Sequence, residues 1–304
     1  MTTGCIMYDI IIIGAGPAGL TAAIYARRAE KSVLVIEKGV FGGQVTFSPK
    51  IENYPGFGEL TGTELADKMV EHAINLGAEF EMETVTGIKN GEVKEVITEN
   101  GSFFAKAVII ATGARHRHLG VEGEEKYIGN GISFCAVCDG AFYNNQEVTV
   151  IGGGNSALQE AILLSMNCKK VTIIQNLPTL TGEEALQNAL KSKDNVEIIC
   201  SSVVTGFTGE DTLSGIIIKN TDTDEEKEIS CDGCFVAIGL IPATDFLKDT
   251  VRLNDYGYVD ADESCRTDAD GIFVAGDCRS KRIRQITTAT ADGAIAALQA
   301  IEKV

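Results

Sequence analysis

Two CxxC pairs, Cys135–Cys138 and Cys231–Cys234, are the residues of this chain best suited to covalent chemistry. A two-residue spacer lets two sulfurs meet in a small ring, so the first pair can cycle between dithiol and disulfide. Asp139 follows directly and can handle the proton that thiolate chemistry must move. The two pairs could instead share a zinc ion, but the second pair leads straight into an apolar strand, which favours a structural turn. We therefore predict redox chemistry at Cys135, Cys138 and Asp139, and no metal site.

A glycine-rich loop lies near the start of the chain, Gly14-Ala15-Gly16-Pro17-Ala18-Gly19, between an apolar strand-like segment at 8–13 and a predicted helix at about 18–28. Gly14, Gly16 and Gly19 let the backbone approach a pyrophosphate, and the helix N-terminus attracts its charge. Glu37 ends the next predicted strand and can hold ribose hydroxyls. This combination predicts a dinucleotide site that includes Pro17 and Ala18 at the helix start.

A second glycine loop, at residues 152–157, also follows a strand and opens a predicted helix at about 155–165. Its following strand ends in Gln175-Asn176-Leu177-Pro178, with no acid for a ribose hydroxyl and no arginine for a 2′-phosphate. Residues 118–244 contain 7 Lys against 18 Asp plus Glu and no Arg. We therefore expect that the fold persists here while the site for NADPH has been lost.

Both loops belong to one repeated pattern of strand, glycine turn, helix and strand, closed by apolar strands at 108–113 and 235–239. Hairpin signals such as Asn90-Gly91 precede each closing strand. The chain is thus predicted to be α/β, with two Rossmann-like three-layer ββα nucleotide-binding domains, the second inserted in the first. The first domain is expected at 1–116 plus 245–304 and the second at 117–244.

Charge and composition exclude several classes of protein. The 304 residues contain 26 basic and 43 acidic side chains, a net charge of −17, which disfavours nucleic acid. There is no apolar run of about 18 residues for a membrane span and no secretion signal at the start. Most of the nine cysteines stand singly in apolar stretches, as expected for thiols in a reducing compartment. We therefore predict a cytoplasmic protein.

Over essentially its whole length the chain resembles the low-molecular-weight thioredoxin reductases. The matching segments, besides the first glycine loop and Cys135 to Gly140, are Gly42-Gly43-Gln44, Glu52-Asn53-Tyr54-Pro55-Gly56, Ala111-Thr112-Gly113-Ala114, Gly276-Asp277-Cys278 and Arg284-Gln285. The resemblance implies FAD in the first domain, a homodimer, thioredoxin as partner, and a Cys135–Cys138 disulfide stacked against the flavin.

The resemblance also implies a role for each matching position. Cys138 is the flavin-side sulfur, Cys135 attacks the disulfide of the partner, and Asp139 handles protons. Gly276 and Asp277 hold the ribityl or phosphate region, and Arg284 with Gln285 lies near the isoalloxazine. The other matching positions implied as FAD contacts are Gly43, Gln44, Asn53, Ala111, Thr112 and Gly113.

One departure from the family pattern is informative. NADPH-dependent members have His-Arg-Arg and a further Arg where this chain has Gln175-Asn176-Leu177 and no following Arg. The chain resembles more the ferredoxin-dependent flavin thioredoxin reductases, which lack those residues, so the resemblance implies reduced ferredoxin as the donor. An NADPH-dependent enzyme with an atypical site, an oxygen-using FAD-dependent disulfide oxidase and a non-catalytic flavoprotein remain the alternatives.

Ferredoxins are acidic, so docking one calls for a positive patch on an otherwise negative protein. The predicted docking residues are Arg279, Lys281, Arg282 and Arg284, next to the flavin segment, together with Arg115 and Arg117.

Overall fold

The computed structural model describes residues 6–48 and 50–304 and has two compact units. The first unit runs to Arg115 and resumes at Ile241; the second is His116–Leu240. The chain thus leaves and re-enters the first unit within a few residues of the expected boundaries. Where it passes between the units, β7 (Ala114–His116) and β16 (Leu240–Pro242) pair as a two-stranded sheet.

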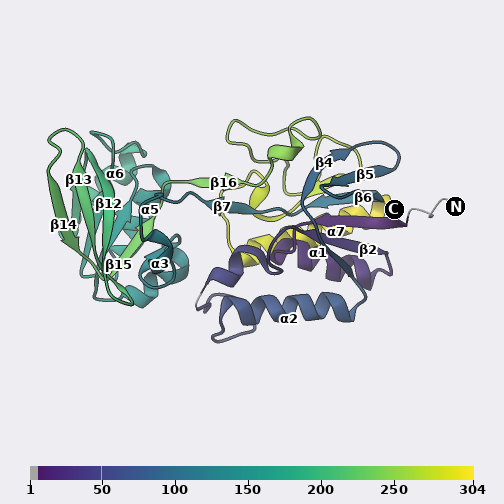
Figure 1. The fold of residues 1–304 in the computed structure, drawn as a ribbon, viewed down its shortest axis with the longest axis horizontal. Helices are drawn as coiled ribbons and strands as arrows, with labels where there is room; N and C mark the ends of the chain where they lie inside the picture. Colours follow the sequence, from purple (N-terminus) through teal and green to yellow (C-terminus); the bar gives the residue numbers. More distant parts are fainter. Residues whose placement is uncertain (1–5, 49) are drawn as a thin grey trace. The chain divides into compact units, whose positions relative to one another are not determined.

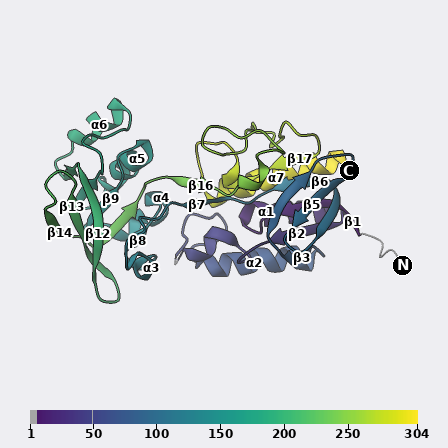
Figure 2. The same ribbon diagram turned by 45° about the horizontal axis from the view of Figure 1, so that its top comes forward.

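The first unit is built on a seven-stranded sheet with helices along one face (Figures 1 and 2). Its strands are β1 (Met7–Ile13), β2 (Val33–Glu37), β3 (Glu79–Met82), β4 (Val85–Lys89), β5 (Lys94–Thr98), β6 (Ser102–Ile110) and β17 (Ile272–Val274). Its helices are α1 (Pro17–Arg28), α2 (Gly62–Asn75), α7 (Ile286–Lys303) and the short η1 (Gly43–Phe47), η3 (Asp245–Leu247) and η4 (Gly276–Cys278).

The strand order is β3-β2-β1-β6-β5-β4, and β17 also pairs with β6. The long β6 pairs in parallel with β1 on one side, while its two halves pair with β5 and with β17 on the other. Alternation along β1 gives the sheet two apolar faces. Ile10 and Ile12 face a cluster formed with α1, α2 and α7, whereas Ile11 and Ile13 face β4, β5 and the segment around Leu247.

The second unit repeats this plan around a five-stranded parallel sheet. The strands of the whole unit, in both of its sheets, are β8 (Ile132–Ser133), β9 (Glu147–Ile151), β10 (Lys170–Ile174), β11 (Val196–Ile199), β12 (Ser202–Gly209), β13 (Leu213–Asn220), β14 (Glu226–Ser230) and β15 (Gly233–Val236). Its helices are α3 (Glu124–Tyr127), α4 (Ala136–Asp139), η2 (Gly140–Tyr143), α5 (Asn155–Leu164) and α6 (Glu184–Lys191).

The parallel sheet has the order β11-β10-β9-β15-β8, and β12-β13-β14 form a separate antiparallel sheet. Val148, Val150 and Phe235 pack against α5, while the opposite face of the same strands packs against β12 and β13. Each unit therefore combines helices, parallel strands and an antiparallel part, which continues the same sheet as β5 and β4 in the first unit and forms a separate sheet in the second. This arrangement confirms the predicted α/β fold. No helix within the described part of the chain is both long enough and apolar enough to cross a membrane.

Candidate functional site

The first glycine loop has the backbone geometry that a dinucleotide site needs. Gly14 has φ +108°, and a Cβ there would lie 2.3 Å from the carbonyl oxygen of Ala111. A Cβ at Gly19 would lie 1.9 Å from the oxygen of Gly14, so this glycine permits close packing of α1 on the loop. A Cβ added at Gly16 would lie no closer than 3.9 Å to another part of the chain, which leaves space for a ligand to approach the backbone. Pro17 begins α1 and Ala18 is buried.

Glu37, at the end of β2, is held by the loop itself. Its Oε2 accepts the N–H of Ala15 at 2.9 Å, and Oε1 accepts that of Gly39 at 2.9 Å. Gly43 also lies against the loop, where its Cβ would be 3.3 Å from Cα of Gly16, while Gln44 next to it is exposed. The carboxylate is therefore fixed at the carboxyl end of the sheet.

The carboxyl ends of β6 and β17 bring two more predicted segments to the same edge, because β1, β6 and β17 run parallel. Ala111 is buried, and Gly113 has φ +68°. Oγ1 of Thr112 and Oδ1 of Asp277 are buried without a hydrogen-bond partner among the described residues. Unsatisfied buried polar atoms beside an open glycine loop suit a ligand rich in hydroxyl and phosphate groups, so these residues fit FAD.

Asp292 of α7 organises the segment after β17 and is missing from the residues predicted from sequence. Its carboxylate accepts the N–H of Gly276 at 3.1 Å, two N–H groups of Arg279 at 3.0 Å each and Nζ of Lys281 at 3.0 Å. Burial raises its pKa, but the two cations hold the pKa below its usual range. An acid on the buried face of an alanine-rich helix was the available sequence signal.

This cluster corrects the predicted docking patch. Arg279 is 8% exposed, and the side chain of Lys281 is 7% exposed. Both cations neutralise a buried carboxylate inside the first unit, so neither can meet an acidic partner protein. Of the predicted docking residues, Arg282, Arg115 and Arg117 are exposed and Arg284 is half-buried.

Arg284 and Gln285 lie where η4 gives way to α7. Nε of Arg284 donates to the carbonyl oxygen of Asp277 at 3.3 Å, and the guanidinium lies 4.2 Å from the ring centroid of Tyr258. Gln285 caps α7, and Nδ2 of Asn53 approaches its Oε1 at 3.5 Å. These residues thus lie in the same unit as the first glycine loop.

Cys135 and Cys138 form a disulfide at the start of α4 in the second unit. Cys135 is the N-cap of this single turn, and its Sγ accepts the N–H of Cys138 at 3.2 Å. Cys135 is half-buried and Cys138 is exposed. The short turn therefore presents the disulfide at the surface of its unit, where a second protein can reach it.

Asp139 ends the same turn. Ser133 Oγ donates to its Oδ2 at 2.6 Å and in turn accepts the N–H of Cys135 at 3.1 Å. Burial raises the pKa of Asp139. The acid is therefore tied through one hydroxyl to the backbone of the turn Cys135–Asp139, called the redox turn below. Its higher pKa favours the protonated form that a proton donor needs.

The second glycine loop repeats the first in backbone but not in chemistry. Gly152 donates to Ile174 at 2.8 Å, as Gly14 does to Ile36 at 2.8 Å. The side chain at the position of Glu37 is Gln175, which is 4% exposed, and a Cβ at Gly153 would lie 2.5 Å from its Cδ and Nε2. An uncharged amide thus covers the middle of this loop.

The second CxxC pair is buried on the sheet rather than held in a turn. Cys234 lies inside β15, and both thiols are free and less than 4% exposed. Burial raises the pKa of Cys231 to about 11 and of Cys234 to about 12. The predicted turn is wrong for Cys234 because β15 begins two residues earlier than expected. The described residues contain no group of three or more potential metal ligands.

Comparison with known proteins agrees with this architecture. Residues 8–293 match the family model described as pyridine nucleotide-disulphide oxidoreductase. A thioredoxin reductase of Listeria monocytogenes is 43% identical over 95% of this chain and 92% of its own length. A "34.2 kDa protein in rubredoxin operon" of Clostridium pasteurianum is 43% identical over 96% of both chains. The crystal structure of thioredoxin reductase from Streptococcus pyogenes superposes with a TM-score of 0.94 at 44% identity, covering 98% of both chains.

Each of these relatives spans almost the whole chain at an identity well above that needed to show common descent. The chain belongs to the pyridine nucleotide-disulphide oxidoreductase family and, within it, to the thioredoxin reductases, which are flavoprotein disulfide oxidoreductases.

Proposed function

We propose that this protein passes electrons from reduced ferredoxin, through FAD and the Cys135–Cys138 disulfide, to thioredoxin. We assign FAD to the first unit and the redox turn to the second. FAD would supply a carrier that takes electrons singly and releases them in pairs. Gly14, Gly16 and Gly19 would admit its pyrophosphate to the backbone, with the unsatisfied Thr112 and Asp277 oxygens nearby.

The dithiol chemistry would follow from the order of the two cysteines. The Cys135 thiolate attacks one sulfur of oxidised thioredoxin, forms a mixed disulfide and releases the other sulfur as a thiolate, which takes up a proton. The Cys138 thiolate then attacks Cys135 Sγ, restores the Cys135–Cys138 disulfide and releases the second thioredoxin sulfur. Asp139, tied to this turn through Ser133, would deliver and collect the protons.

The choice of ferredoxin over a nicotinamide donor rests on the second glycine loop, whose middle is covered by the amide of Gln175. A nicotinamide dinucleotide phosphate brings several negative charges, which need cations or free N–H groups. Here Gln175 lies on the loop, and the exposed positions that follow are Asn176 and Leu177. Glu183 adds a negative charge at the start of α5, because it exchanges two hydrogen bonds with Asn155, at 2.7 and 2.9 Å.

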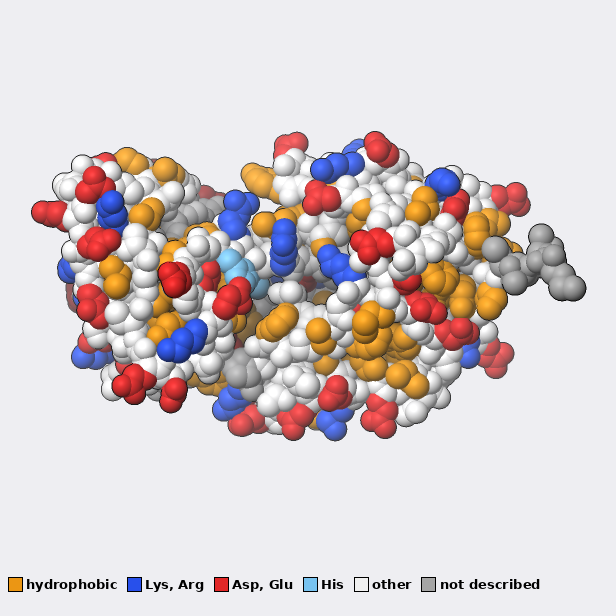
Figure 3. Space-filling model, viewed as in Figure 1, with side chains coloured by type: hydrophobic (Ala, Val, Ile, Leu, Met, Phe, Trp, Pro, Cys, Tyr) orange, Lys and Arg blue, Asp and Glu red, His pale blue; other side chains and the backbone are white. Residues whose placement is uncertain are grey.

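Ferredoxin can drive this reaction without a nicotinamide. A low-potential ferredoxin near −400 mV and thioredoxin near −270 mV differ by roughly 130 mV, which over two electrons is about 6 kcal/mol downhill. Acidic side chains are spread over the face of the molecule in Figure 3, so an acidic donor needs a local positive site. Arg282, exposed and two residues before Arg284, is the docking residue that we propose in the first unit.

An anaerobic spectrophotometric titration tests the donor. NADPH and NADH should leave the flavin band of the purified protein oxidised, whereas reduced ferredoxin should bleach it and generate thioredoxin dithiol. Asn176→Arg with Leu177→Arg should create measurable bleaching by NADPH, since Leu177 is 45% exposed and its replacement disturbs no core. Rapid bleaching of the unmodified protein by micromolar NADPH would overturn the ferredoxin assignment.

The second candidate function is an NADPH-dependent thioredoxin reductase with an atypical nucleotide site. It is favoured by the second loop's backbone, because Gly152 has φ +129° and α5 starts directly beyond it, as in the first unit. The same titration separates the two candidates, since only this one predicts a nicotinamide-reduced flavin.

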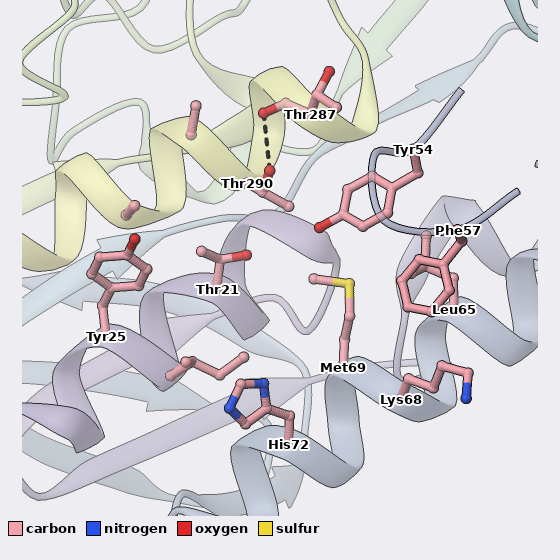
Figure 4. Close-up of a pocket in the computed structure, with 13 residues that line it drawn as sticks. Thr21, Tyr25, Tyr54, Phe57, Leu65, Lys68, Met69, His72, Thr287 and Thr290 are labelled. Carbon is pink, nitrogen blue, oxygen red and sulfur yellow. Dashed lines mark hydrogen bonds between the residues drawn. The ribbon is translucent and has the colours of Figure 1, made fainter. Parts of the chain in front are cut away.

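We also propose a homodimer, as the family resemblance implies. A groove of about 460 Å³ in the first unit lies between α1, α2, α7 and the segment carrying Tyr54 and Phe57 (Figure 4). Tyr25 is 38% exposed and Phe57 is 40% exposed at this groove, an apolar surface that a second copy would cover. Phe57→Glu should convert the dimer to a monomer in analytical ultracentrifugation. An unchanged sedimentation coefficient would place the interface elsewhere.

We further propose a reducing cytoplasmic setting, consistent with six free cysteines among the described residues.

A further inference from the structure

Ser133 joins the two ends of the redox turn. This serine is the last residue of β8, the strand at one edge of the parallel sheet, and is 5% exposed. Its Oγ donates to Oδ2 of Asp139 at 2.6 Å and accepts the N–H of Cys135 at 3.1 Å. One buried hydroxyl thus bridges the first and the last residue of the turn.

The segment that carries Ser133 is itself held in place. Ser133 pairs with Phe235 of β15, which is fully buried. The ring of Phe134, the next residue, stacks with the imidazoles of His116 and His118, whose centroids lie 4.9 and 5.2 Å away. The strand pairing and the stacked rings therefore fix the position of the hydroxyl before the redox turn begins.

The Asp139 carboxylate depends on this hydroxyl. Among the described residues Ser133 is its only hydrogen-bond donor, because Oδ1 of Asp139 is buried without a partner. Burial raises the pKa of Asp139, whereas the hydrogen bond from Ser133 opposes that rise by stabilising the charged form. Without the hydroxyl, a buried carboxylate would be left with no donor.

We propose that Ser133 is a positioning residue for the disulfide exchange, whose hydroxyl fixes Asp139 to the redox turn in its carboxylate form, so that Asp139 can accept a proton from Cys138. The inference rests on the dithiol chemistry proposed above, but it does not depend on the electron donor. Ser133 is missing from the residues predicted from sequence.

The proton balance uses both forms of Asp139. The carboxylate takes the proton of the Cys138 thiol, and the Cys138 thiolate attacks Sγ of Cys135 in the mixed disulfide. The Cys135–Cys138 bond forms, the bond between Cys135 and thioredoxin breaks, and the electron pair of that bond leaves on the thioredoxin sulfur. This thiolate takes the proton from Asp139, which returns to the carboxylate.

A hydroxyl can serve both forms of the acid. Towards the carboxylate Ser133 donates, as the structure has it. Towards a protonated carboxyl it can accept with its second lone pair, while the first keeps the N–H of Cys135. The bridge can therefore persist through the proton transfer, which a methyl group at this position does not allow.

Titratable side chains on two neighbouring elements respond to the charge of Asp139. Burial raises the pKa of Tyr143 in η2 to about 12 and that of Glu160 in α5 to about 7, and the charge of Asp139 contributes to both shifts. Tyr143 therefore stays neutral, and Glu160 loses its proton only after Asp139 has ionised. In the reduced protein, the Cys135 and Cys138 thiols are further titratable groups of the turn.

Single-turnover exchange tests the role of Ser133. Protein reduced with dithiothreitol and desalted is mixed anaerobically with oxidised thioredoxin between pH 5 and pH 9, and the first equivalent of thioredoxin dithiol is trapped with acid. The rate should fall on the acid side as Asp139 takes up a proton. In Ser133→Ala this acid limb should lie about one pH unit higher, a roughly tenfold loss on the acid side with little change at pH 9, where thiols ionise unaided.

Matched variants separate this role from a structural one. Ser133→Thr keeps the hydroxyl and should restore the unmodified profile, whereas Ser214→Ala removes an exposed hydroxyl of β13 and should not alter it. Glu160→Gln should leave the acid limb in place, because Glu160 is uncharged there.

An acid limb that does not move in Ser133→Ala, or a rate lowered equally at every pH, overturns the proposal. So does an acid limb that Glu160→Gln moves as far as Ser133→Ala does. Unmodified protein that fails to reduce thioredoxin at any pH would instead overturn the proposed function.

Nuclear magnetic resonance of the oxidised holoprotein needs no variant of Ser133. The N–H of Cys135 donates to the hydroxyl that binds Asp139, so its amide resonance should shift as Asp139 titrates, and Asp139→Asn should remove that shift. This measurement decides alone if Ser133→Ala does not fold. A Cys135 resonance without pH dependence, or one that titrates unchanged in Asp139→Asn, overturns the bridge.

Discussion

Replacing Asp292 by Asn should strongly destabilise the first unit, because Asp292 is the buried carboxylate that pairs with Arg279 and Lys281. The substitution keeps the shape of the side chain but removes the charge that faces Arg279 and Lys281. Both cations are buried, at 3.0 Å from the carboxylate, and the backbone N–H of Gly276 also depends on it. The variant leaves two buried positive charges whose remaining carboxylate neighbour is Asp277, 3.9 Å from Nζ of Lys281.

Breaking a buried ion pair by removing one partner costs about 3–5 kcal/mol, because the remaining charge is desolvated without compensation. Asn can still accept one hydrogen bond, so we expect about 3 kcal/mol. The contrast is Asp270, whose carboxylate lies 2.8 Å from Nζ of Lys303 with side chains 78% and 44% exposed. Water and salt screen such an exposed pair, so removing Asp270 should leave the stability almost unchanged.

Urea unfolding followed by circular dichroism compares Asp292→Asn, Asp270→Asn and the unmodified protein. With an m-value near 3 kcal/mol/M, Asp292→Asn should lower the midpoint by about 1 M. It should also lose flavin on gel filtration, since Asp292 holds the segment of Gly276 and Asp277. Equal midpoints for the two variants would refute the argument from burial.

The same carboxylate makes a pH-dependent contribution. Despite burial, its two cations hold the pKa of Asp292 below the usual 3.8 in the folded state. Its stabilisation is therefore complete above about pH 4 and is lost as the pH falls through the lower, folded pKa. The acid sensitivity of Asp292→Asn should be correspondingly smaller.

Two further substitutions test the site. Gly19→Ala would put a Cβ 1.9 Å from the oxygen of Gly14, so it should cost at least about 2 kcal/mol of stability and reduce the flavin content of the purified protein. The control is Gly58→Ala, whose Cβ would have no atom within 4 Å and which should keep the flavin. Equal flavin content in both variants would contradict the close packing of α1 on the loop. Cys138→Ser should abolish catalytic thioredoxin reduction and keep the flavin. The control Cys200→Ser replaces a free thiol and should keep both the activity and the flavin. Thioredoxin turnover in Cys138→Ser would leave the disulfide without a catalytic role.

Local patterns predicted the layers of the fold. The β-branched run of β1, the glycines after it and the apolar face of α1 specify strand, turn and helix from neighbouring residues, and the pattern recurs in the second unit. The boundaries of β15 were predicted less well. Gly233 and Cys234 carry no strong strand preference, and it is pairing with β9 on one side and β8 on the other that makes them a strand.

The sequence by itself determined the two glycine loops, the CxxC turn and the acid beside it, because each is a short segment whose chemistry depends on residues a few positions apart. Only the tertiary structure decided which charges are surface charges and which are buried. Arg279 and Lys281 read as a docking patch from the sequence, but α7 brings Asp292 against them. Burial and long-range pairing set these properties, and neither is encoded within a local window of sequence.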